Sequence, residues 1–240
     1  MEITMEGFKI KTRVNVHDVD YNGVCKASAI MRYMQTAAEE QLKDNGMGYD
    51  RLKEMNRVFV ISKFRLELDR ALREGEPLEV TTFPCESRGF SFLRCYGIEQ
   101  NGVTVARAVS VWALLDPSCR SLVRVDDFEL GLKLLPPLNL DIPRLRLPTD
   151  AARVGSYGVH YGDVDRNMHM NNTRYPDMYS NFMPMPGKRI RSMTISYSGE
   201  AGLGEKLDVM RSGAANEFYF KTVRADGLTN SEAHLVLEDI

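Results

Sequence analysis

The stretch DVDYNGVCKASAIMRYMQTAAEEQL, residues 18–42, joins a polar, glycine-containing turn to a long segment whose apolar residues recur every three or four positions. This spacing places the apolar residues on one face of a helix, and that face has to pack against another element. Ser28 is a favourable N-cap, and Gly46 is a favourable residue for ending the helix. We therefore expect a polar loop that leads into a helix of about four turns.

Four segments with strand character follow this helix. Residues 58–68, 78–86, 90–100 and 103–116 are rich in β-branched and aromatic side chains. Asn101–Gly102, between the last two segments, is a strong signal for a hairpin turn. A helix followed by antiparallel strands predicts an α+β unit in which the helix packs on one face of the sheet.

The second half of the chain repeats this plan. The sequence DVDYN at residues 18–22 matches DVDRN at residues 163–167, an offset of 145. GEPLEV at residues 75–80 matches GEKLDV at residues 204–209, an offset of 129, and the hairpin turns match at an offset of 125. Three matches in the same order indicate two copies of one unit, with the second copy trimmed between its elements.

The second copy has the same kinds of element as the first. A shorter helix is predicted over roughly residues 172–183, with Pro176 tolerated in its first turn. The hairpin turn of this copy is Asp226–Gly227. The predicted strands of the second copy cover residues 189–200, 206–213, 216–225 and 228–239.

These patterns divide the chain into three parts. The first unit covers residues 1–130, a linker covers residues 131–152, and the second unit covers residues 153–240. The linker is rich in leucine, so we expect it to be extended and to lie against the surface of the protein. Four prolines exclude a regular element from it: Pro136, Pro137, Pro143 and Pro148.

The two copies differ at the residues best suited to chemistry. GDVDRNMHMNN, residues 162–172, contains two aspartates, a histidine and three asparagines. By the offset of 145, His169 corresponds to Val24 in the first copy, and by the offset of 129, Glu200 corresponds to Ala71. A duplicated enzyme that kept one active site would show this asymmetry, so we expect the first unit to be catalytically silent.

The residues also resemble a known family. A long helix packed on an antiparallel sheet and entered through a D-x-D-x-x-G loop resembles the hotdog fold of thioesterases. Two such units in one chain, with a D-x-N-x-H-x-N-N motif opening the second, resemble the acyl-acyl-carrier-protein (acyl-ACP) thioesterases of plants and bacteria. The motif residues are Asp165, Asn167, His169, Asn171 and Asn172.

The resemblance extends to a glutamate in a Tyr-x-x-Glu context, which matches Tyr197 and Glu200. Plant members carry a cysteine directly after this glutamate, where this chain has Ala201, so a cysteine nucleophile is excluded at that position and attack by water is favoured. The resemblance implies two tandem hotdog units that hydrolyse fatty acyl-ACP to free fatty acid and ACP and so terminate fatty acid synthesis. It also implies that the acyl chain runs into the first unit, between helix and sheet.

By the resemblance, Asp165, Asn167, His169 and Glu200 form the catalytic network. Either carboxylate could be the base that activates water, and the sequence leaves this choice open. The Asn167 amide could position water or donate to the thioester carbonyl, and the His169 imidazole could donate a hydrogen bond or carry a proton.

The helix that follows this loop offers a further contribution. The first N–H groups of a helix have no partner within the helix, and the helix dipole favours negative charge there. We expect Asn171 and Asn172 to lie at this end, where the developing oxyanion would be stabilised.

Overall composition excludes several classes of function. A net charge of −2 argues against a general nucleic-acid binder. No secretory signal and no apolar run of the ~20 residues needed to span a membrane are evident, and Cys25, Cys85, Cys95 and Cys119 read as free thiols, so a cytoplasmic protein is expected. No cysteine pattern of a zinc site and no phosphate-binding glycine motif is present, so we expect no metal and no cofactor.

The expected partner is ACP with its phosphopantetheine arm. This carrier is acidic and would need a basic surface. Lys188, Arg189 and Arg191 are the first candidates, and Arg144 and Arg146 in the linker are the second. The chain could be a monomer that acts as its own pseudo-dimer, or it could form a homodimer through exposed strand edges.

Two other functions compete with this interpretation. The chain could hydrolyse acyl-CoA on the same scaffold, or it could be a double-hotdog protein that binds acyl groups without hydrolysing them. A binding protein has no need of the Asp165, Asn167 and His169 set, which favours an enzyme.

Overall fold

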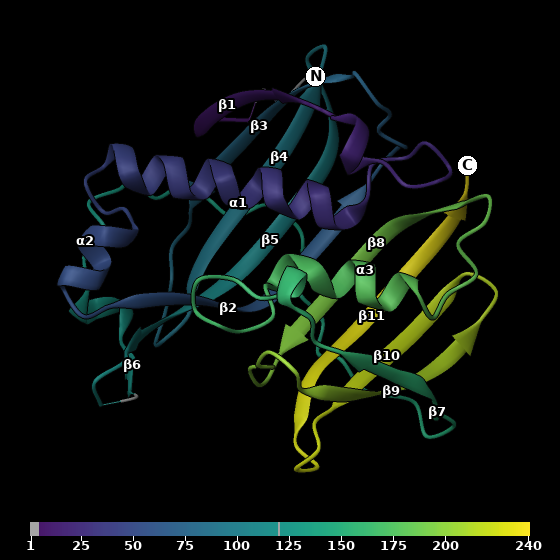
Figure 1. The fold of residues 1–240 in the computed structure, drawn as a ribbon. Helices are drawn as coiled ribbons and strands as arrows, with labels where there is room; N and C mark the ends of the chain where they lie inside the picture. Colours follow the sequence, from purple (N-terminus) through teal and green to yellow (C-terminus); the bar gives the residue numbers. More distant parts are fainter. Residues whose placement is uncertain (1–4, 120) are drawn as a thin grey trace.

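A computed structural model describes residues 5–119 and 121–240. Its centre is one antiparallel sheet in the order β1-β3-β4-β5-β2-β8-β11-β10-β9-β7, with β6 paired to β5 (Figure 1). The strands are β1 (Phe8–Arg13), β2 (Val58–Leu68), β3 (Pro77–Pro84), β4 (Phe92–Gln100), β5 (Val103–Asp116), β6 (Ser121–Val123), β7 (Ala152–Gly158), β8 (Lys188–Tyr197), β9 (Lys206–Ala214), β10 (Glu217–Val223) and β11 (Thr229–Asp239).

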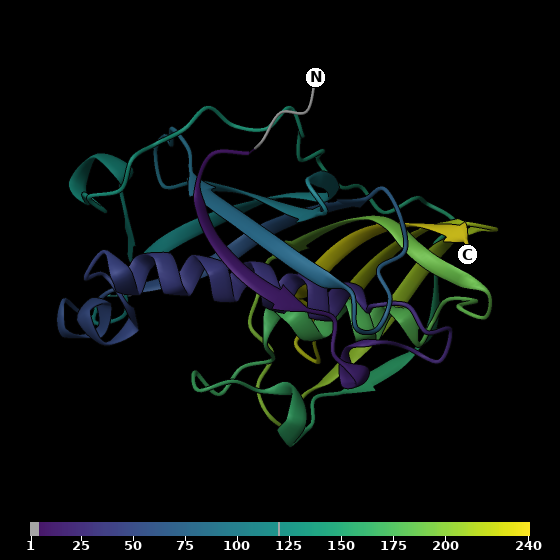
Figure 2. The same ribbon diagram turned by 90° about the horizontal axis from the view of Figure 1, so that it is seen from above.

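The helices lie on one face of this sheet, α1 over the first half and α3 over the second (Figures 1 and 2). They are α1 (Ala27–Asp44), α2 (Tyr49–Glu54) and α3 (Tyr175–Ser180), with 3-10 turns at Val16–Asp18, Val125–Asp127, Tyr161–Asp163 and Asn172–Arg174. The two halves join where β2 pairs with β8, from Lys63 opposite Ser196 to Glu67 opposite Ser192. The α+β architecture with two tandem helix-on-sheet units is therefore confirmed.

Helix α1 forms where the sequence predicts it, but its start differs. The N-cap is Lys26, whose N–H donates to the carbonyl of Asp18 at 2.9 Å, so Ser28 already lies inside the helix. The Ser28 hydroxyl is buried, with no hydrogen-bond partner in the part of the chain that the structure describes. The prediction of Ser28 as N-cap is therefore wrong. Gly46 adopts a φ of +73° just after the helix, as a residue that ends a helix does.

The second helix is shorter than predicted. Residues 172–174 form a 3-10 turn and α3 itself has six residues, ending at Ser180 rather than near Met183. Pro184 and Pro186 follow closely, and a proline disfavours helical geometry in the residue before it. The side chains of Met183 and Met185 still pack against the core, although the backbone there has left the helix.

The two edge strands were not among the predicted elements. Strand β1 pairs with β3 at one edge of the sheet, and β7 pairs with β9 at the other. The sequence of β1, FKIKTR, alternates strictly but is short, and ARVGSYG in β7 is rich in small residues. Strand β7 begins at Ala152, where the linker was expected to end.

The linker lies against the surface of the protein, as expected, and Figure 2 shows it on the sheet face opposite the helices. Leu135, Leu138 and Leu140 of the linker belong to a second, smaller core, and the carbonyl of Pro84 accepts a hydrogen bond from the N–H of Leu135 at 3.0 Å. This core contains Met5, Phe83, Cys85, Cys95, Val109 and Leu140, with Leu93, Leu135, Leu138 and Ile142 packed against it. Within residues 5–119 and 121–240, no helix has both the length and the apolar character required to cross a membrane.

Candidate active site

The loop of residues 160–172, here the His169 loop, and the loop of residues 15–27, here the Val24 loop, have the same backbone. In the His169 loop, the N–H of Asp165 donates to the carbonyl of His169 at 3.0 Å. In the Val24 loop, the N–H of Asp20 donates to the carbonyl of Val24 at 2.8 Å. Met168 has a φ of +64° where Gly23 has +71°.

The same correspondence holds where each loop meets the next strand. The N–H of Met170 donates to the carbonyl of Ala201 at 2.7 Å, and the N–H of Cys25 donates to the carbonyl of Leu72 at 2.8 Å. These bonds repeat at offsets of 145 and 129, which confirms that His169 corresponds to Val24. Since Leu72 corresponds to Ala201, the residue before it, Ala71, corresponds to Glu200.

The fold brings His169 and Glu200 together from different elements. His169 lies in its loop and Glu200 lies in the turn between β8 and β9. The Nε2 atom of His169 is 3.3 Å from Oε2 of Glu200, and both side chains are partly accessible to solvent, at 40% and 64% of their surface. The pair therefore faces open space in which a water and a thioester could be placed.

Asp165 is held differently from Glu200. Its Oδ1 accepts from the N–H of Asn167 at 2.8 Å, and its Oδ2 accepts from the side-chain amide of Asn171 at 3.4 Å. Both carboxylate oxygens are thus occupied within the loop, whereas the one polar contact of Glu200 in the described residues is with His169. This geometry favours Asp165 as the carboxylate that orders the loop and Glu200 as the carboxylate next to the histidine.

Asn171 and Asn172 close the loop. Asn171 is the N-cap of the 3-10 turn, since its Oδ1 accepts from the N–H of Thr173 at 2.9 Å. The carbonyl of Asn172 accepts from the hydroxyl of Tyr197 at 3.0 Å, and its amide donates to the carbonyl of Ile61 at 3.4 Å. A 3-10 turn follows Asn171, and α3 begins only at Tyr175 and has six residues, so the helix dipole at this point is weaker than the predicted helix over residues 172–183 would give.

The site opens onto a groove of about 2260 Å³ that continues into the first unit, here called the large groove. Asp165, Asn167, His169 and Glu200 line one end of it. Its walls in the first unit are aromatic, and Phe59 makes edge-on contacts with Phe92, Trp112 and Phe128 at centroid distances of 5.3, 6.2 and 6.3 Å. A polar end that leads into an aromatic groove suits a ligand with a reactive head and an apolar tail.

Comparison with known proteins agrees with this architecture. Residues 6–130 match the family model described as the acyl-ACP thioesterase N-terminal domain, and residues 147–235 match the C-terminal domain of the same family. The chain belongs to the acyl-ACP thioesterase family.

Curated relatives in this family share little sequence with the chain. A palmitoyl-acyl carrier protein thioesterase of Cuphea hookeriana is 24% identical over 222 residues, which cover 84% of this chain and 53% of the relative. The acyl-ACP hydrolase FATB3 of Cuphea viscosissima is 24% identical over 185 residues, which cover 70% of this chain and 45% of the relative. The chain thus spans about half the length of these relatives.

Solved structures in the family have the same fold. A crystal structure of an acyl-ACP thioesterase from Bacteroides thetaiotaomicron aligns at a TM-score of 0.87 with 22% identity, covering 96% of this chain and 97% of the other. The 12:0-ACP thioesterase from Umbellularia californica aligns at a TM-score of 0.85 with 17% identity, covering 99% and 100%. At these identities the likeness establishes the double-hotdog fold.

In this family member, the Val24 loop borders a much smaller space. Its pocket has a volume of about 320 Å³ and is lined by Val24, Ala71, Ile30 and the methionines Met183 and Met185. The loop itself is fastened to the second unit through one asparagine that corresponds to Asn167. This loop therefore has neither the polar pair nor the long groove of the other.

That asparagine, Asn22, spans the two units. Its amide donates to the carbonyls of Met185 and Lys188 at 3.0 and 3.2 Å, and its Oδ1 accepts from the N–H of Gly187 at 3.1 Å. The side chain of Asn167, in contrast, makes no hydrogen bond in the described part of the chain and lines the large groove. The same residue type is thus structural in one loop and available to a ligand in the other.

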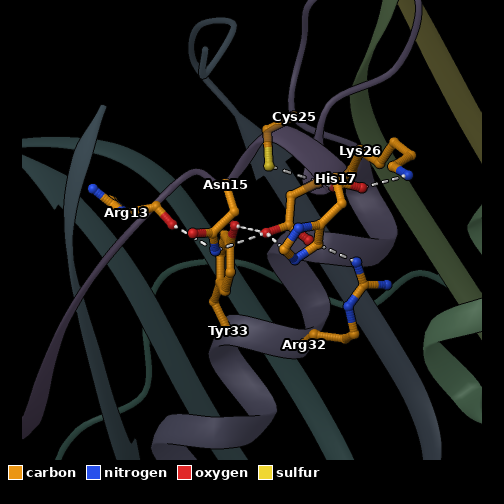
Figure 3. Close-up of polar contacts among 8 residues, drawn as sticks. Arg13, Asn15, His17, Cys25, Lys26, Arg32 and Tyr33 are labelled. Carbon is orange, nitrogen blue, oxygen red and sulfur yellow. Dashed lines mark hydrogen bonds and ion pairs between the residues drawn. The ribbon is translucent and has the colours of Figure 1, made fainter. Parts of the chain in front are cut away.

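A buried carboxylate fixes the Val24 loop to α1. Asp18 accepts hydrogen bonds from the Tyr33 hydroxyl at 2.6 Å, the Arg32 guanidinium at 3.0 Å and the Asn15 amide at 3.1 Å. Figure 3 shows Tyr33 and Arg32 reaching from α1 towards the loop beside Asn15 and His17. Burial alone would raise the pKa of Asp18, but these hydrogen bonds outweigh it and hold the pKa below its ordinary value.

The basic residues predicted to face the carrier do not meet at the site. Arg189 is only 7% exposed, forms an ion pair with Glu238 and donates to the carbonyl of Leu68, so its prediction as a surface residue is wrong. Lys188 is paired with Asp239 at 2.6 Å, while Arg191 is exposed. None of the three lines the large groove.

Other cations do line the large groove. Lys43, Lys53 and Arg166 border it, and none of them has an ion-pair partner within the described residues. The guanidinium carbon of Arg166 lies 3.3 Å from the centre of the Tyr49 ring, which connects the His169 loop to α2. Because Arg166 lies in the other half of the chain from Lys43 and Lys53, no local pattern could have grouped the three.

Proposed function

We propose that this chain is a thioesterase that hydrolyses fatty acyl-ACP to free fatty acid and ACP. The observation that carries the proposal is the His169–Glu200 pair, 3.3 Å apart, at the polar end of an aromatic groove that extends into the other unit. Membership of the acyl-ACP thioesterase family supports the substrate class. In this arrangement the second unit supplies the reacting groups and the first unit holds the acyl chain.

In the proposed reaction, Glu200 and His169 polarise a water, which attacks the thioester carbonyl carbon. The carbonyl oxygen becomes an oxyanion and accepts a hydrogen bond from the Asn167 amide. The intermediate collapses with cleavage of the carbon–sulfur bond. The proton taken from water passes through His169 to the leaving thiolate, so that the products are a free acid and a thiol.

The thiols of the chain support attack by water. Position 201, directly after Glu200, is a fully buried alanine. Cys85 lines the large groove, but its hydrogen bond with Cys95 and its burial raise the pKa of its thiol, so it is not present as a nucleophilic thiolate at neutral pH.

The carrier would approach the mouth of the large groove. Lys43, Lys53 and Arg166 line this groove without an ion-pair partner in the described residues, so the carboxylates of an acidic carrier would pair with them. We further propose a cytoplasmic enzyme, because its cysteines are free thiols. A homodimer would form by pairing of the exposed edge strand β7 with a second copy.

The test is a hydrolysis assay with the same acyl groups on ACP and on CoA, read out as free acid. We expect hydrolysis of acyl-ACP, with the rate lowered about 1000-fold in Glu200→Gln. Glu205→Gln is the matched control: Glu205 lies in the same turn, but its carboxylate accepts from the N–H of Gly202 at 3.1 Å. A strong preference for acyl-CoA would show that the chain is an acyl-CoA thioesterase instead. If neither thioester were hydrolysed, the chain would be an acyl-binding protein.

A further inference from the structure

The second unit contains a buried polar cluster behind the turn that carries Glu200. Five of its members are at most 2% exposed, which is unusual for so many hydroxyl and amide groups in the core of a hotdog unit. The cluster consists of Tyr175, Tyr179, Thr222, Asn230 and Ser231, and the half-buried Tyr197 lies beside it.

A continuous chain of hydrogen bonds runs through this cluster. The Tyr179 and Ser231 hydroxyls are 2.7 Å apart, and Ser231 and Thr222 are 2.6 Å apart. The Thr222 hydroxyl donates to Oδ1 of Asn230 at 2.9 Å. Asn230 then donates from its amide nitrogen to the Tyr175 hydroxyl at 3.0 Å. The chain of bonds ends with a second donation from Asn230, to the carbonyl of Gly199 at 2.6 Å, next to Glu200.

The first unit has an apolar residue at every equivalent position. Ser198 donates its N–H to the carbonyl of Asn230 at 2.8 Å, as Asp69 does to Val105 at 3.0 Å. Ser231 lies opposite Tyr197 and Thr222 in the second sheet, as Ala106 lies opposite Leu68 and Ile98 in the first. The offset of 145 pairs Tyr175 with Ile30 and Tyr179 with Met34. The full set of apolar counterparts is Ile30, Met34, Leu68, Ile98, Val105 and Ala106.

The fold itself therefore does not require these polar groups. Val105 occupies the position of Asn230 in a unit that keeps the equivalent main-chain bond, from the N–H of Asp69 to the carbonyl of Val105. Burying an amide and several hydroxyls is unfavourable unless all of them are paired. The cluster occurs in the unit that has His169 and Glu200, and its counterpart is apolar in the unit that lacks them.

We propose that Asn230 is a positioning residue that holds Glu200 against His169, an inference that rests on the proposed thioester hydrolysis. Asn230 fixes the turn on one side of Glu200, through its side chain to Gly199 and through its carbonyl, which accepts from the N–H of Gly199 at 3.0 Å. On the other side, the carbonyl of Ala201 is bound by the N–H of Met170, the residue after His169. The residues on both sides of Glu200 are therefore held by hydrogen bonds, Gly199 by Asn230 and Ala201 by Met170 of the His169 loop.

Tyr175 and Tyr197 connect Asn230 to the end of the His169 loop. The Tyr197 hydroxyl donates to the carbonyl of Asn172 at 3.0 Å, and its ring packs edge-on against Tyr175 at 5.1 Å. Burial raises the pKa of Tyr175 to about 12, so its hydroxyl stays protonated and neutral while it accepts the bond from Asn230. A shift of Asn230 would therefore be felt on both sides of the reacting pair.

The test replaces Asn230 with the residue of the silent unit. In Asn230→Val we expect kcat to fall about 100-fold, because a small displacement of a reacting group has an effect of this size. KM should change by less than about twofold, since the acyl groove is untouched. Ser212→Ala is the control: Ser212 is buried in the same sheet and its hydroxyl donates to Asp150 at 2.6 Å, so it loses a hydrogen bond remote from the site.

A double-mutant comparison separates positioning from a general loss of structure. If Asn230 acts through Glu200, adding Asn230→Val to Glu200→Gln should change kcat by less than about twofold. The positioning role would be overturned if the losses of kcat multiplied in the double variant, or if Asn230→Val left kcat unchanged. In either case hydrolysis by the wild type would still support the proposed function. A wild-type protein without thioesterase activity would overturn the proposed function instead.

Stability is measured alongside by thermal unfolding. Thr222→Ile with Asn230→Val supplies the pair found in the silent unit, Ile98 and Val105, and leaves no unpaired threonine hydroxyl at that place. We expect this double variant to fold and to show the same loss of kcat as Asn230→Val. If both variants failed to fold, the cluster would be a requirement of the fold and the inference would be wrong.

Discussion

The His169 loop and the Val24 loop share one backbone and differ in what their side chains do. Each closes the same turn and binds the same strand through main-chain hydrogen bonds. In one loop, a histidine and an asparagine face a large groove. In the other, a valine takes the place of the histidine, and the asparagine fastens the first unit to the second. The scaffold of a hotdog site is thus separable from its chemistry.

This comparison sorts the carboxylates of the chain. Those kept in both units serve the scaffold: Glu76 accepts from the N–H of Arg73 at 2.9 Å, and Glu205 accepts from the N–H of Gly202 at 3.1 Å. Glu200 exists in one unit only and has no main-chain N–H to accept from in the described residues. Asp165 and Asp20 are equivalent carboxylates, and each accepts the same main-chain hydrogen bond in its own loop. Only the loop of Asp165 also carries the histidine that pairs with Glu200.

Among the changes that compare the two loops, the largest effect is expected for this pair. Asp165→Asn should lower kcat for acyl-ACP about 100-fold, because it disturbs the loop that holds Asn167 and His169. Asp20→Asn changes the matching residue of the silent loop, whose Oδ1 accepts from the N–H of Asn22 at 2.9 Å, and should leave kcat within about twofold. Steady-state hydrolysis by both variants checks this. Equal losses would mean that the two loops share one function.

The two equivalent asparagines are expected to affect different properties, Asn22 the stability and Asn167 the activity. Asn22→Ala removes three hydrogen bonds between the units and should lower the free energy of unfolding by about 1–3 kcal/mol. Asn167→Ala removes no hydrogen bond of its side chain in the described residues and should lower kcat about 100-fold, the lower end of the loss that removal of an oxyanion donor causes. Denaturant unfolding and hydrolysis are measured on both variants.

The crossed result is specific in both directions. Asn22→Ala should keep its kcat, and Asn167→Ala should keep its free energy of unfolding within about 0.5 kcal/mol. If Asn22→Ala lost activity but kept its free energy of unfolding, the hydrogen bonds of Asn22 between the two units would contribute to the site.

A smaller, pH-dependent effect is expected at Asp18. Asp18→Asn should cost about 1.5–3 kcal/mol of stability at pH 7, because three hydrogen bonds to a buried carboxylate weaken. The pKa of Asp18 is lowered by folding, so its contribution is present above the unfolded value of about 3.9 and is lost as the pH falls through the folded pKa. Thermal unfolding of wild type and variant should therefore converge below about pH 4. A difference that stays constant down to pH 3 would contradict this sign.

The sequence was informative about the repeat because the backbone of the loop imposes its own residues. Asp at the first position of the turn accepts main-chain hydrogen bonds, and residues with positive φ follow it in both loops, so the motif is also present in the copy that lacks His169 and Glu200. Comparing the two copies then exposed His169 and Glu200 as the unmatched residues. Runs of β-branched and aromatic residues and the Asn101–Gly102 turn predicted strands β2 to β5 and β8 to β11, but not the edge strands β1 and β7.

What the sequence did not show depends on tertiary contacts. The large groove is lined by residues scattered from α1 to the turn between β8 and β9, and Lys43, Lys53 and Arg166 are brought together only as parts of this lining. The burial of Arg189 follows from β8 lying in the centre of a continuous sheet, where it is paired with β2 and β11. Asn230 resembles any polar residue at the start of a strand until its counterpart, Val105, is placed on it.

The smallest effect is expected from rebuilding the silent site. Val24→His with Ala71→Glu, introduced into His169→Ala, restores the two missing groups on the correct backbone. We expect no hydrolysis of long-chain acyl-ACP above the His169→Ala background, for two separate reasons. The neighbouring pocket holds about 320 Å³ instead of about 2260 Å³, and Ile30, Leu68 and Val105 cannot anchor the new glutamate.

A short-chain thioester separates these two reasons, because an acetyl group fits a pocket of about 320 Å³. If the grafted pair hydrolyses the acetyl thioester but not the long-chain one, size alone silences the first unit, and the polar cluster around Asn230 is dispensable. If it hydrolyses neither, and adding Val105→Asn restores the acetyl reaction, then a hotdog loop needs a positioned glutamate as well as the right residues. We expect the second result, because the histidine and glutamate are held in register in the active unit by bonds that the silent unit does not make.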